Sequence, residues 1–255
     1  MSKLPIAVAT ETRPPYSVLA AVYDVVMEHV DYDLWAEYVH ELLQMHRHPF
    51  KSVVELGSGT GSFAFAFQEW GPYDFVGIDV SAQMTEVARR KAELFNAEVQ
   101  FEVADFTNFR LERPVDFAVL LYDGLNYLLL DEQVGDLFRC VHAALKPGSL
   151  FLFDQSTPAN SINNAEFFED EGEAEGVSYI RKSYYDAETR LHTTAFDIAV
   201  GDQQFNEVHV ERAYTLDEML ALIEDSPFRL EAHYDGFSQD PADAETERIH
   251  WLLRA

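Results

Sequence analysis

Residues 53–61 read VVELGSGTG, an apolar strand that carries an acid, Glu55, near its end and runs into a glycine-rich turn. Glycine at positions 57, 59 and 61 lets the backbone turn sharply and lie against a ligand with no Cβ in the way. Residues 62–70 then predict a helix whose free N–H groups point at that ligand. Because dinucleotide sites use similar glycines, the turn alone predicts a nucleotide-type ligand and leaves its identity open.

Two acids follow at the ends of the next two predicted strands. Residues 73–79, YDFVGID, form a short apolar strand that ends in Asp79, where a carboxylate can bind both hydroxyls of a ribose. Residues 99–103, VQFEV, are followed by Asp105 and Phe106. The carboxylate of Asp105 can accept from an adenine amino group while Phe106 contacts the base. The two acids together predict an adenosine site.

At these residues the chain resembles the class I S-adenosylmethionine-dependent methyltransferases. That family carries an E/D-x-G-x-G-x-G turn, an acid that ends the second strand and an Asp-apolar pair after the third. The G-x-G-x-x-G spacing of dinucleotide enzymes is not met, because position 62 is serine. The resemblance implies that S-adenosylmethionine, with its product S-adenosylhomocysteine, is held by Tyr23, Glu55, Gly57, Ser58, Gly59, Gly61, Asp79, Val80, Met84, Asp105, Phe106 and Tyr122.

Composition narrows the substrate class. With 255 residues and an unbroken α/β pattern, we expect one main domain. The net charge is −27, from 45 acids against 18 Lys and Arg, so nucleic acid is not an expected partner. The acids are scattered, which fits solvated surface groups or a salt-adapted host. A local cluster of acids, which either attracts a cationic amine or forms a solvated loop, comprises Glu166, Glu169, Asp170, Glu171, Glu173 and Glu175.

Neither a leader peptide nor an apolar run of membrane-spanning length is visible, so we expect a cytoplasmic protein with no membrane partner. The single cysteine, Cys140, lies in a helix predicted over residues 131–145 and is expected to pack rather than react. Cys and His do not show the spacing of a metal site, and no metal is expected. The protein is expected to be a monomer or a homodimer.

The regular strand–helix alternation predicts a Rossmann-like α/β fold, with a seven-stranded, mostly parallel sheet and helices on both faces. Further strands are expected at 115–121, 149–154, 228–234 and 248–254, and a helix with a Thr215–Glu218 capping box. We expect an N-terminal helical lid over residues 1–50, a methyltransferase core over 51–154 and 215–255, and an antiparallel β insert over 155–214.

A wider resemblance covers the whole chain. Tyr23-Asp24, residues 122–128 (YDGLNYL), residues 207–209 (EVH) and residues 212–214 (RAY) look like a bacterial small-molecule methyltransferase subgroup. Its members share the architecture of sugar-amine N,N-dimethyltransferases, in which a helical lid and an antiparallel insert roof the cofactor. The resemblance therefore implies a small-molecule acceptor. One departure is Gly124, where the subgroup is expected to carry serine.

Methyl transfer from a sulfonium is an in-line displacement with a neutral leaving group, so positioning dominates, and a base is needed only for a protonated nucleophile. The loop after the fourth strand lies at the ligand-binding crevice of such sheets. Tyr122 and Asn126 are therefore catalytic candidates, with Asp123 beside them, whereas Tyr127 and Leu128 are expected at the core or rim.

His209 is the third catalytic candidate, because it shares a predicted strand face with Glu207 and Glu211. It either accepts a proton from the acceptor or makes a structural hydrogen bond, and His192 is a weaker candidate for substrate contact. Rings expected either to line the pocket or to pack are Tyr16, Tyr23, Tyr184, Tyr185, Phe196 and Phe205. A nitrogen or oxygen acceptor fits this pocket. Rival interpretations are a nucleotide-dependent oxidoreductase and a non-catalytic S-adenosylmethionine-binding sensor or partner module.

Overall fold

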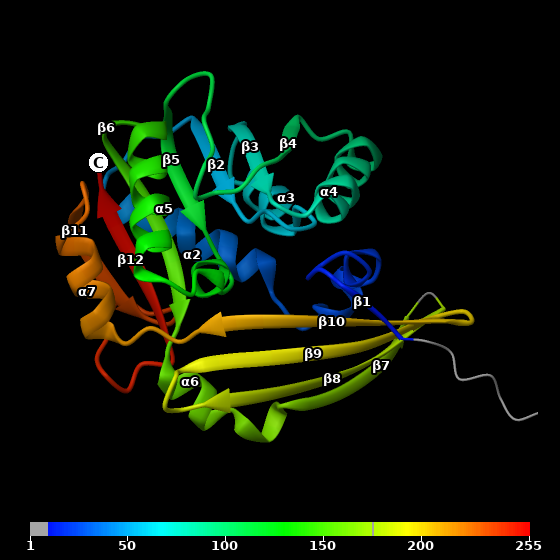
Figure 1. Ribbon diagram of the computed structural model, residues 1–255. Coiled ribbons are helices and arrows are strands. Elements are labelled where there is room, and N and C mark those ends of the chain that lie inside the picture. The colour runs from blue at the N-terminus through cyan, green and yellow to red at the C-terminus, as the bar shows by residue number, and fades with distance from the viewer. Residues whose placement is uncertain (1–9, 175) are drawn as a thin grey trace, which may run out of the picture.

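The computed structural model describes residues 10–174 and 176–255. The first nine residues of the predicted lid, and Glu175 of the acidic cluster, lie outside the described residues. The chain forms two sheets, one of seven strands and one of five, which Figure 1 shows as a core with a long antiparallel sheet beneath it.

The seven-stranded core sheet runs in the order β11-β12-β6-β5-β2-β3-β4. Its strands are β2 (Ser52–Leu56), β3 (Asp74–Asp79), β4 (Val99–Val103), β5 (Val115–Leu120), β6 (Leu145–Ser156), β11 (Arg229–Asp235) and β12 (Arg248–Arg254). The pairs from β6 to β4 are parallel, whereas β12 pairs antiparallel with both β6 and β11. The predicted Rossmann-like, mostly parallel seven-stranded sheet is therefore confirmed.

Helices cover both faces of this sheet, as expected for a parallel sheet buried on two sides. They are α2 (Tyr32–Met45), α3 (Ser62–Gln68), α4 (Ala82–Phe95), α5 (Asp131–Ala144) and α7 (Leu216–Glu224). One hydrophobic cluster joins α5 and α7 to the sheet, and a second joins α2, α3 and α4 to its other face. The predicted capping box opens α7, where the Thr215 hydroxyl accepts from the backbone N–H of Glu218 over 3.2 Å.

The N-terminal segment divides into two parts. Trp35, Val39 and Leu42 of α2 are buried in the same cluster as Phe67 and Phe117, so α2 is part of the core. Ahead of it lie β1 (Glu11–Arg13), η1 (Leu19–Ala21) and α1 (Tyr23–Val26). We call residues 10–30 the cap. Its buried Leu19, Val22 and Val26 pack against Phe196 and Ile198 of the five-stranded sheet, which makes a third cluster.

The five-stranded sheet has the order β1-β10-β9-β8-β7. It contains β7 (Glu169–Ala174), β8 (Val177–Asp186), β9 (Leu191–Val200) and β10 (Gln203–Arg212) as an antiparallel meander. Two features were not predicted. β1 adds to the edge of β10 in parallel, and the segment after β6 opens with α6 (Pro158–Asn163) and η3 (Ala165–Phe167) before the first strand. Pro158 at the first turn of α6 is a helix-start signal.

Among the described residues, the search for a helix long and apolar enough to cross a membrane finds none.

Candidate active site

The glycine turn between β2 and α3 adopts the conformation that its sequence requires. Gly57, Gly59 and Gly61 have φ angles of 61°, 53° and 79°, in the left-handed region that side chains rarely tolerate. A Cβ on Gly61 would also lie 2.6 Å from the ring of Phe101. The turn is held to the neighbouring strand by a hydrogen bond of 3.0 Å from Ser58 N–H to the carbonyl of Ile78. Backbone alone therefore faces the ligand here.

Asp79 has two roles. Its carboxylate accepts from Gly59 N–H over 2.8 Å and from Ser81 N–H over 2.7 Å, so it fixes the glycine turn and the start of α4. Burial raises the pKa of this carboxyl, while the two backbone hydrogen bonds oppose the rise. Since a carboxylate offers about four acceptor positions, two remain for the hydroxyls of a ribose. The sequence predicts the ribose role, but not the loop-fixing role.

The end of β4 lies beside Asp79, because Ala104 N–H donates to the Asp79 carbonyl over 2.9 Å. Asp105 is exposed, and its Oδ1 accepts from the N–H and the hydroxyl of Thr107 over 2.8 and 2.7 Å. Its other oxygen is used by none of the described hydrogen bonds and suits an adenine amino group. Val80 is 67 % exposed and can cover a base, whereas Met84 is buried and Phe106 packs against the core.

Glu55 supplies an unpaired acceptor at the glycine turn. Its side chain is buried, and Oε2 has no hydrogen-bond partner among the described residues. Burial, reinforced by Asp79 and opposed by Lys91, raises the pKa of this carboxyl well above its usual value. A cationic ligand group would satisfy such an acceptor. Groups suited to a ribose, an adenine and an ammonium therefore occur together, which fits S-adenosylmethionine.

Asp24 ties the cap to the cofactor turn. Its Oδ1 accepts from the hydroxyl of Thr60 over 2.5 Å, and its Oδ2 lies 2.7 Å from the ammonium of Lys91. The carbonyl of Tyr16 accepts from the hydroxyl of Ser81 over 3.1 Å, next to Asp79. The cap therefore reaches both the glycine turn and the ribose end of the site.

A cavity of about 600 Å³ lies between the cap, the loop after β5 and the inner face of the five-stranded sheet. We call it the acceptor cavity. Its lining includes Tyr16, Tyr23, Tyr122, Asp123, Tyr127, Asn160, Ser161, Asp170, Arg181, Ser183, His192, Thr194, Phe196, His209, Glu211 and Arg248. The predicted candidates Tyr122 and His209 are thus brought together, although they come from different sheets.

The loop after β5 is strained and pinned. Tyr122 and Asp123 have φ angles of 59° and 63°, which is costly for residues with a side chain. Arg248 holds this loop through hydrogen bonds of 2.8 and 3.1 Å to the two carboxylate oxygens of Asp123, and through a further bond to Asp154. The carboxylate of Asp123 is therefore already paired with a guanidinium.

Asn126 lies in η2 (Gly124–Tyr127) and is fully engaged with the backbone. Its amide donates to the carbonyls of Ser156 and Arg212 over 2.9 and 2.7 Å, and its oxygen accepts from Ser156 N–H over 3.0 Å. It does not line the acceptor cavity. We therefore give Asn126 a positioning role, in which it joins the loop after β5 to β6 and β10. It does not lie near the methyl group as the sequence predicted.

Three polar side chains form a chain across the acceptor cavity. The hydroxyls of Tyr16 and Tyr127 are 2.5 Å apart, and the hydroxyl of Tyr127 lies 2.9 Å from Nδ1 of His209. On the far side of the imidazole, Nε2 lies 3.6 Å from a carboxylate oxygen of Glu207. Tyr127, which was expected only at the core or rim, is the link. The three leucines that follow it, Leu128, Leu129 and Leu130, conceal this role in the sequence.

Glu207 also holds the cap. Its carboxylate is 0 % exposed and accepts from the N–H groups of Tyr16, Val18 and Leu19 over 2.8, 2.5 and 3.2 Å. The hydroxyl of Ser17 adds a bond of 3.1 Å. Burial disfavours the charged form, but His209 and these donors hold the pKa of Glu207 below its usual value. The buried charge is thus compensated by the cap.

Comparison with known proteins agrees with this site. A family model described as a methyltransferase domain matches residues 53–148, which include the glycine turn, Asp79 and Asp105. YqeM of Bacillus subtilis (strain 168), a presumed methyltransferase, is 29 % identical over 247 residues, which cover 92 % of this chain and 94 % of YqeM. The chain is an S-adenosylmethionine-dependent methyltransferase.

Solved structures share the fold of this methyltransferase. An S-adenosylmethionine-dependent methyltransferase from Clostridium acetobutylicum ATCC 824 superposes with a TM-score of 0.78 at 21 % identity, covering 94 % of this chain and 98 % of the other. CalS10, an amino pentose methyltransferase from Micromonospora echinaspora solved with S-adenosylmethionine bound, gives a TM-score of 0.69 at 19 % identity, covering 91 % and 96 %. The expected enzyme class and cofactor are confirmed, against the oxidoreductase alternative.

The remaining sequence candidates divide between the faces of the five-stranded sheet. Phe196 and His192 line the acceptor cavity, and Nδ1 of His192 lies 3.0 Å from the hydroxyl of Ser161. Tyr184 is 68 % exposed and points away from the cavity, so the expectation that it lines the pocket is wrong. Phe205 lines a different hollow.

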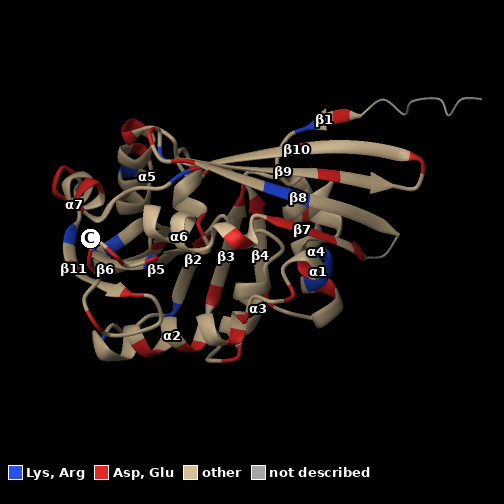
Figure 2. Ribbon diagram, turned by 90° about the horizontal axis from the view of Figure 1, so that it is seen from below, with Lys and Arg blue, Asp and Glu red and all other residues tan. Residues whose placement is uncertain are grey.

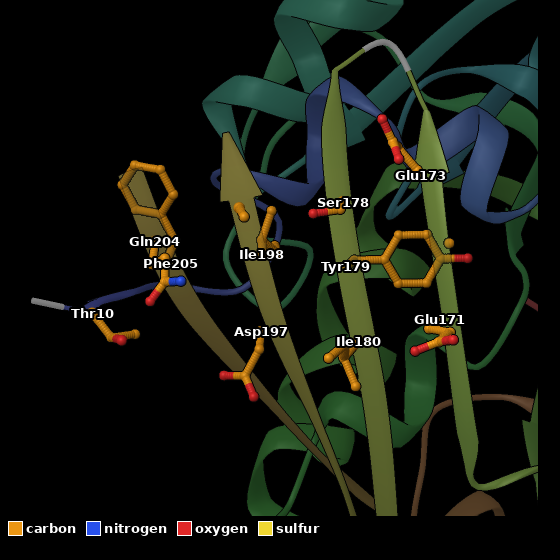
Figure 3. A pocket seen from close by; sticks show the side chains of 12 residues that line it. Thr10, Glu171, Glu173, Ser178, Tyr179, Ile180, Asp197, Ile198, Gln204 and Phe205 are labelled. Atoms are coloured by element: carbon orange, nitrogen blue, oxygen red, sulfur yellow. The ribbon is translucent and has the colours of Figure 1, made fainter. Parts of the chain in front are cut away.

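That second hollow, of about 770 Å³, is shown in Figure 3. It is lined by residues of the five-stranded sheet, including Tyr179, Asp197 and Phe205, and by Thr10. None of its lining residues comes from the core sheet or from the loops that carry the cofactor residues. The smaller cavity, by contrast, is lined in part by Arg248 of the core sheet and by Tyr122 and Asp123 of the loop after β5. Among the residues that the structure describes, groups of His, Cys, Asp and Glu suited to a metal ion are not found.

Proposed function

We propose that this methyltransferase transfers the methyl group to a nitrogen or oxygen of a small molecule bound in the acceptor cavity. The observation that carries the proposal is the place of this cavity. Two cap residues that line it lie next to the cofactor loops. The carbonyl of Tyr16 is hydrogen-bonded to Ser81, and Tyr23 is followed by Asp24, which is hydrogen-bonded to Thr60 of the glycine turn. A cavity of about 600 Å³ is the size of a small-molecule site.

Bound S-adenosylmethionine would supply the methyl group on a positively charged sulfonium. The protein's part is to hold the acceptor in line with that group and to exclude water. The cap, the pinned loop at Tyr122 and the five-stranded sheet would enclose it from three sides. We propose accordingly that residues 51–154 and 215–255 bind the cofactor and that the insert over 155–214 binds the acceptor.

His209 is the proposed proton acceptor. Nδ1 is hydrogen-bonded to the Tyr127 hydroxyl, and Nε2 on the opposite side of the ring lies 3.6 Å from the Glu207 carboxylate. Burial raises the pKa values of Tyr127 and Tyr16 well above the usual range, so these phenols stay neutral and orient hydrogen bonds. The chain from Tyr16 to His209 gives a proton from the acceptor a path to the imidazole.

An amine is the favoured acceptor. An ammonium group entering this cavity meets Glu211 beside His209, and burial together with Asp123 raises the pKa of Glu211 to about 8. A cationic ligand would stabilise the ionised form of this acid. The amino pentose methyltransferase with the same fold supports an acceptor that carries an amino group. The presence of an acceptor cavity also supports turnover over a non-catalytic sensor or partner module, which need not keep such a cavity.

The test is a screen of amine, phenol and carboxylate metabolites for release of S-adenosylhomocysteine, with mass spectrometry of the product. We expect an amine that gains a methyl group on nitrogen. Transfer to a phenol would still agree with a small-molecule acceptor in this cavity, but it would show that the acceptor is a phenol and not an amine. Release confined to macromolecular acceptors, with no small molecule methylated, would contradict the proposal.

A further inference from the structure

The inner face of the five-stranded sheet forms a polar roof over the acceptor cavity, and strand register sets its order. Arg181 on β8 is paired with Phe196 on β9, which is paired with Glu207 on β10. In the next row, Ser183 is paired with Thr194, which is paired with His209. The roof therefore carries a cation on the β8 side and the Glu207–His209 pair on the β10 side.

Arg181 has unused hydrogen-bonding capacity. Its Nη2 donates to the carbonyl of Phe167 over 3.2 Å, and the carboxylate of Asp170 is 3.9 Å away, too far for a hydrogen bond. Its Nε is buried and has no partner among the described residues. Arg248, in the same cavity, is by contrast bonded to two carboxylates. A buried guanidinium N–H without an acceptor is costly, and an anionic ligand group would satisfy it.

The surroundings of Arg181 suit an anion. Ser161, Ser183 and His192 line the same part of the cavity and offer hydroxyl and imidazole donors. The wider surface would not attract an anion, since the net charge of the chain is −27. Figure 2 shows one blue band on β8, and the Lys and Arg residues of this strand are Arg181 and Lys182. Arg181 therefore places a positive charge inside the cavity of an acidic protein, where it can attract a negative group.

We propose that Arg181 forms an anion subsite, so that the methyl acceptor is an amine that also carries a phosphate or carboxylate group. The link to an amine rests on the proposed function, whereas anion binding at Arg181 does not. Strands β8 and β10 lie two strand spacings apart, about 10 Å. The anionic group would therefore sit roughly that far from His209, at the opposite end of a small acceptor.

The test observes Arg181 directly, by nuclear magnetic resonance of its Nε–H signal in protein loaded with S-adenosylhomocysteine. Inorganic phosphate and acetate are titrated separately, and the signal is assigned by its loss in Arg181→Gln. We expect a saturable shift with one or both anions, and the tighter anion identifies the acceptor as a phosphate ester or a carboxylate. In Arg181→Gln, calorimetry should show anion affinity reduced by about tenfold or more.

Lys182→Gln is the matched control, because it removes the same charge from the neighbouring position, which is exposed on the outer face. We expect it to bind the anion as the wild type does. An Nε–H signal that does not move, or equal losses in the two variants, would overturn the inference. If anions fail to bind while a neutral amine is still methylated, the anion subsite is wrong and the proposed function stands. If anions bind but nothing is methylated, the proposed function fails instead.

Discussion

The backbone N–H of Tyr16 donates to the carboxylate of Glu207 over 2.8 Å, which joins the cap to the five-stranded sheet. The same residue, Tyr16, places its ring in the acceptor cavity and its carbonyl against Ser81 beside the cofactor loop. The buried carboxylate of Glu207 thus links the five-stranded sheet to the cap and, through Tyr16, to the cofactor loop.

Glu207→Gln should loosen the cap. The amide keeps one acceptor oxygen but loses the charge that satisfies several donors, so we expect a loss of about 1 to 3 kcal/mol in the stability of the cap. Hydrogen exchange at residues 16–19 measures it, with turnover falling in parallel. Glu188→Gln, the same change at an exposed position in the turn between β8 and β9, provides a control. Unchanged exchange protection in Glu207→Gln would mean that the cap is held by packing alone.

The cap should also respond to acid. The pKa of Glu207 is lowered in the folded protein from a reference value of 4.5, so its contribution to stability is present above about pH 4.5. It is lost as the pH falls through the lowered folded value. We expect exchange protection at residues 16–19 to decline in this acidic range before the core sheet unfolds, and to be independent of pH there in Glu207→Gln.

Asp79→Ala should weaken cofactor binding by about 1.5 to 3 kcal/mol, because it removes a charged acceptor for the ribose. Asp79→Asn separates the two roles of this side chain. The amide oxygen can still accept from one backbone N–H, so the glycine turn should be better preserved than in the alanine variant. Calorimetry with S-adenosylhomocysteine gives both affinities. Wild-type affinity in both variants would place the ribose elsewhere.

Arg248→Met should be strongly destabilising. The guanidinium pairs with Asp123 and with the fully buried Asp154, so its removal leaves uncompensated buried charge at an expected cost of about 3 to 5 kcal/mol. Arg229→Met is the matched control, since Arg229 is 70 % exposed and its partner Glu231 keeps a second pair with Arg254, so the loss should be less than about 1 kcal/mol. Chemical denaturation measures both, and equal effects would contradict the burial argument.

The cofactor half of the site is predictable from sequence because its signals are local. The glycines at 57, 59 and 61 require left-handed backbone, and Asp79 and Asp105 follow two short apolar strands directly. The core sheet is predictable for a similar reason, since each strand has its own apolar run. Only strand limits differ, as in β6, which begins at Leu145 rather than at residue 149.

The acceptor half is less predictable because its contacts join distant parts of the chain. The bond from Tyr127 to His209 and the pairing of Arg248 with Asp123 leave no mark in local periodicity. The parallel pairing of β1 with β10 is equally non-local. Asn126 lies in the expected loop, but its side chain turns to the backbone of β6 and β10, which loop position alone does not reveal.

His209→Gln should lower turnover while cofactor affinity stays within about 0.5 kcal/mol, since none of the described contacts of His209 is with a residue expected to hold the cofactor. Glutamine keeps a hydrogen-bonding group toward Tyr127 but cannot take up a proton. Turnover against pH in the variant should lose any dependence on the imidazole. An unchanged turnover and pH profile would assign His209 to structure only.

The measurement that tests the acceptor cavity most directly is to fill it. Thr194 lines the cavity, whereas its neighbour Thr193 faces the outer side of β9 opposite the exposed Tyr184. Thr194→Trp and Thr193→Trp therefore add the same ring to opposite faces. With an acceptor found by the screen, we predict that Thr194→Trp loses methyl transfer yet binds S-adenosylhomocysteine as the wild type does, and that Thr193→Trp keeps both. Full methyl transfer by a folded Thr194→Trp would contradict the account.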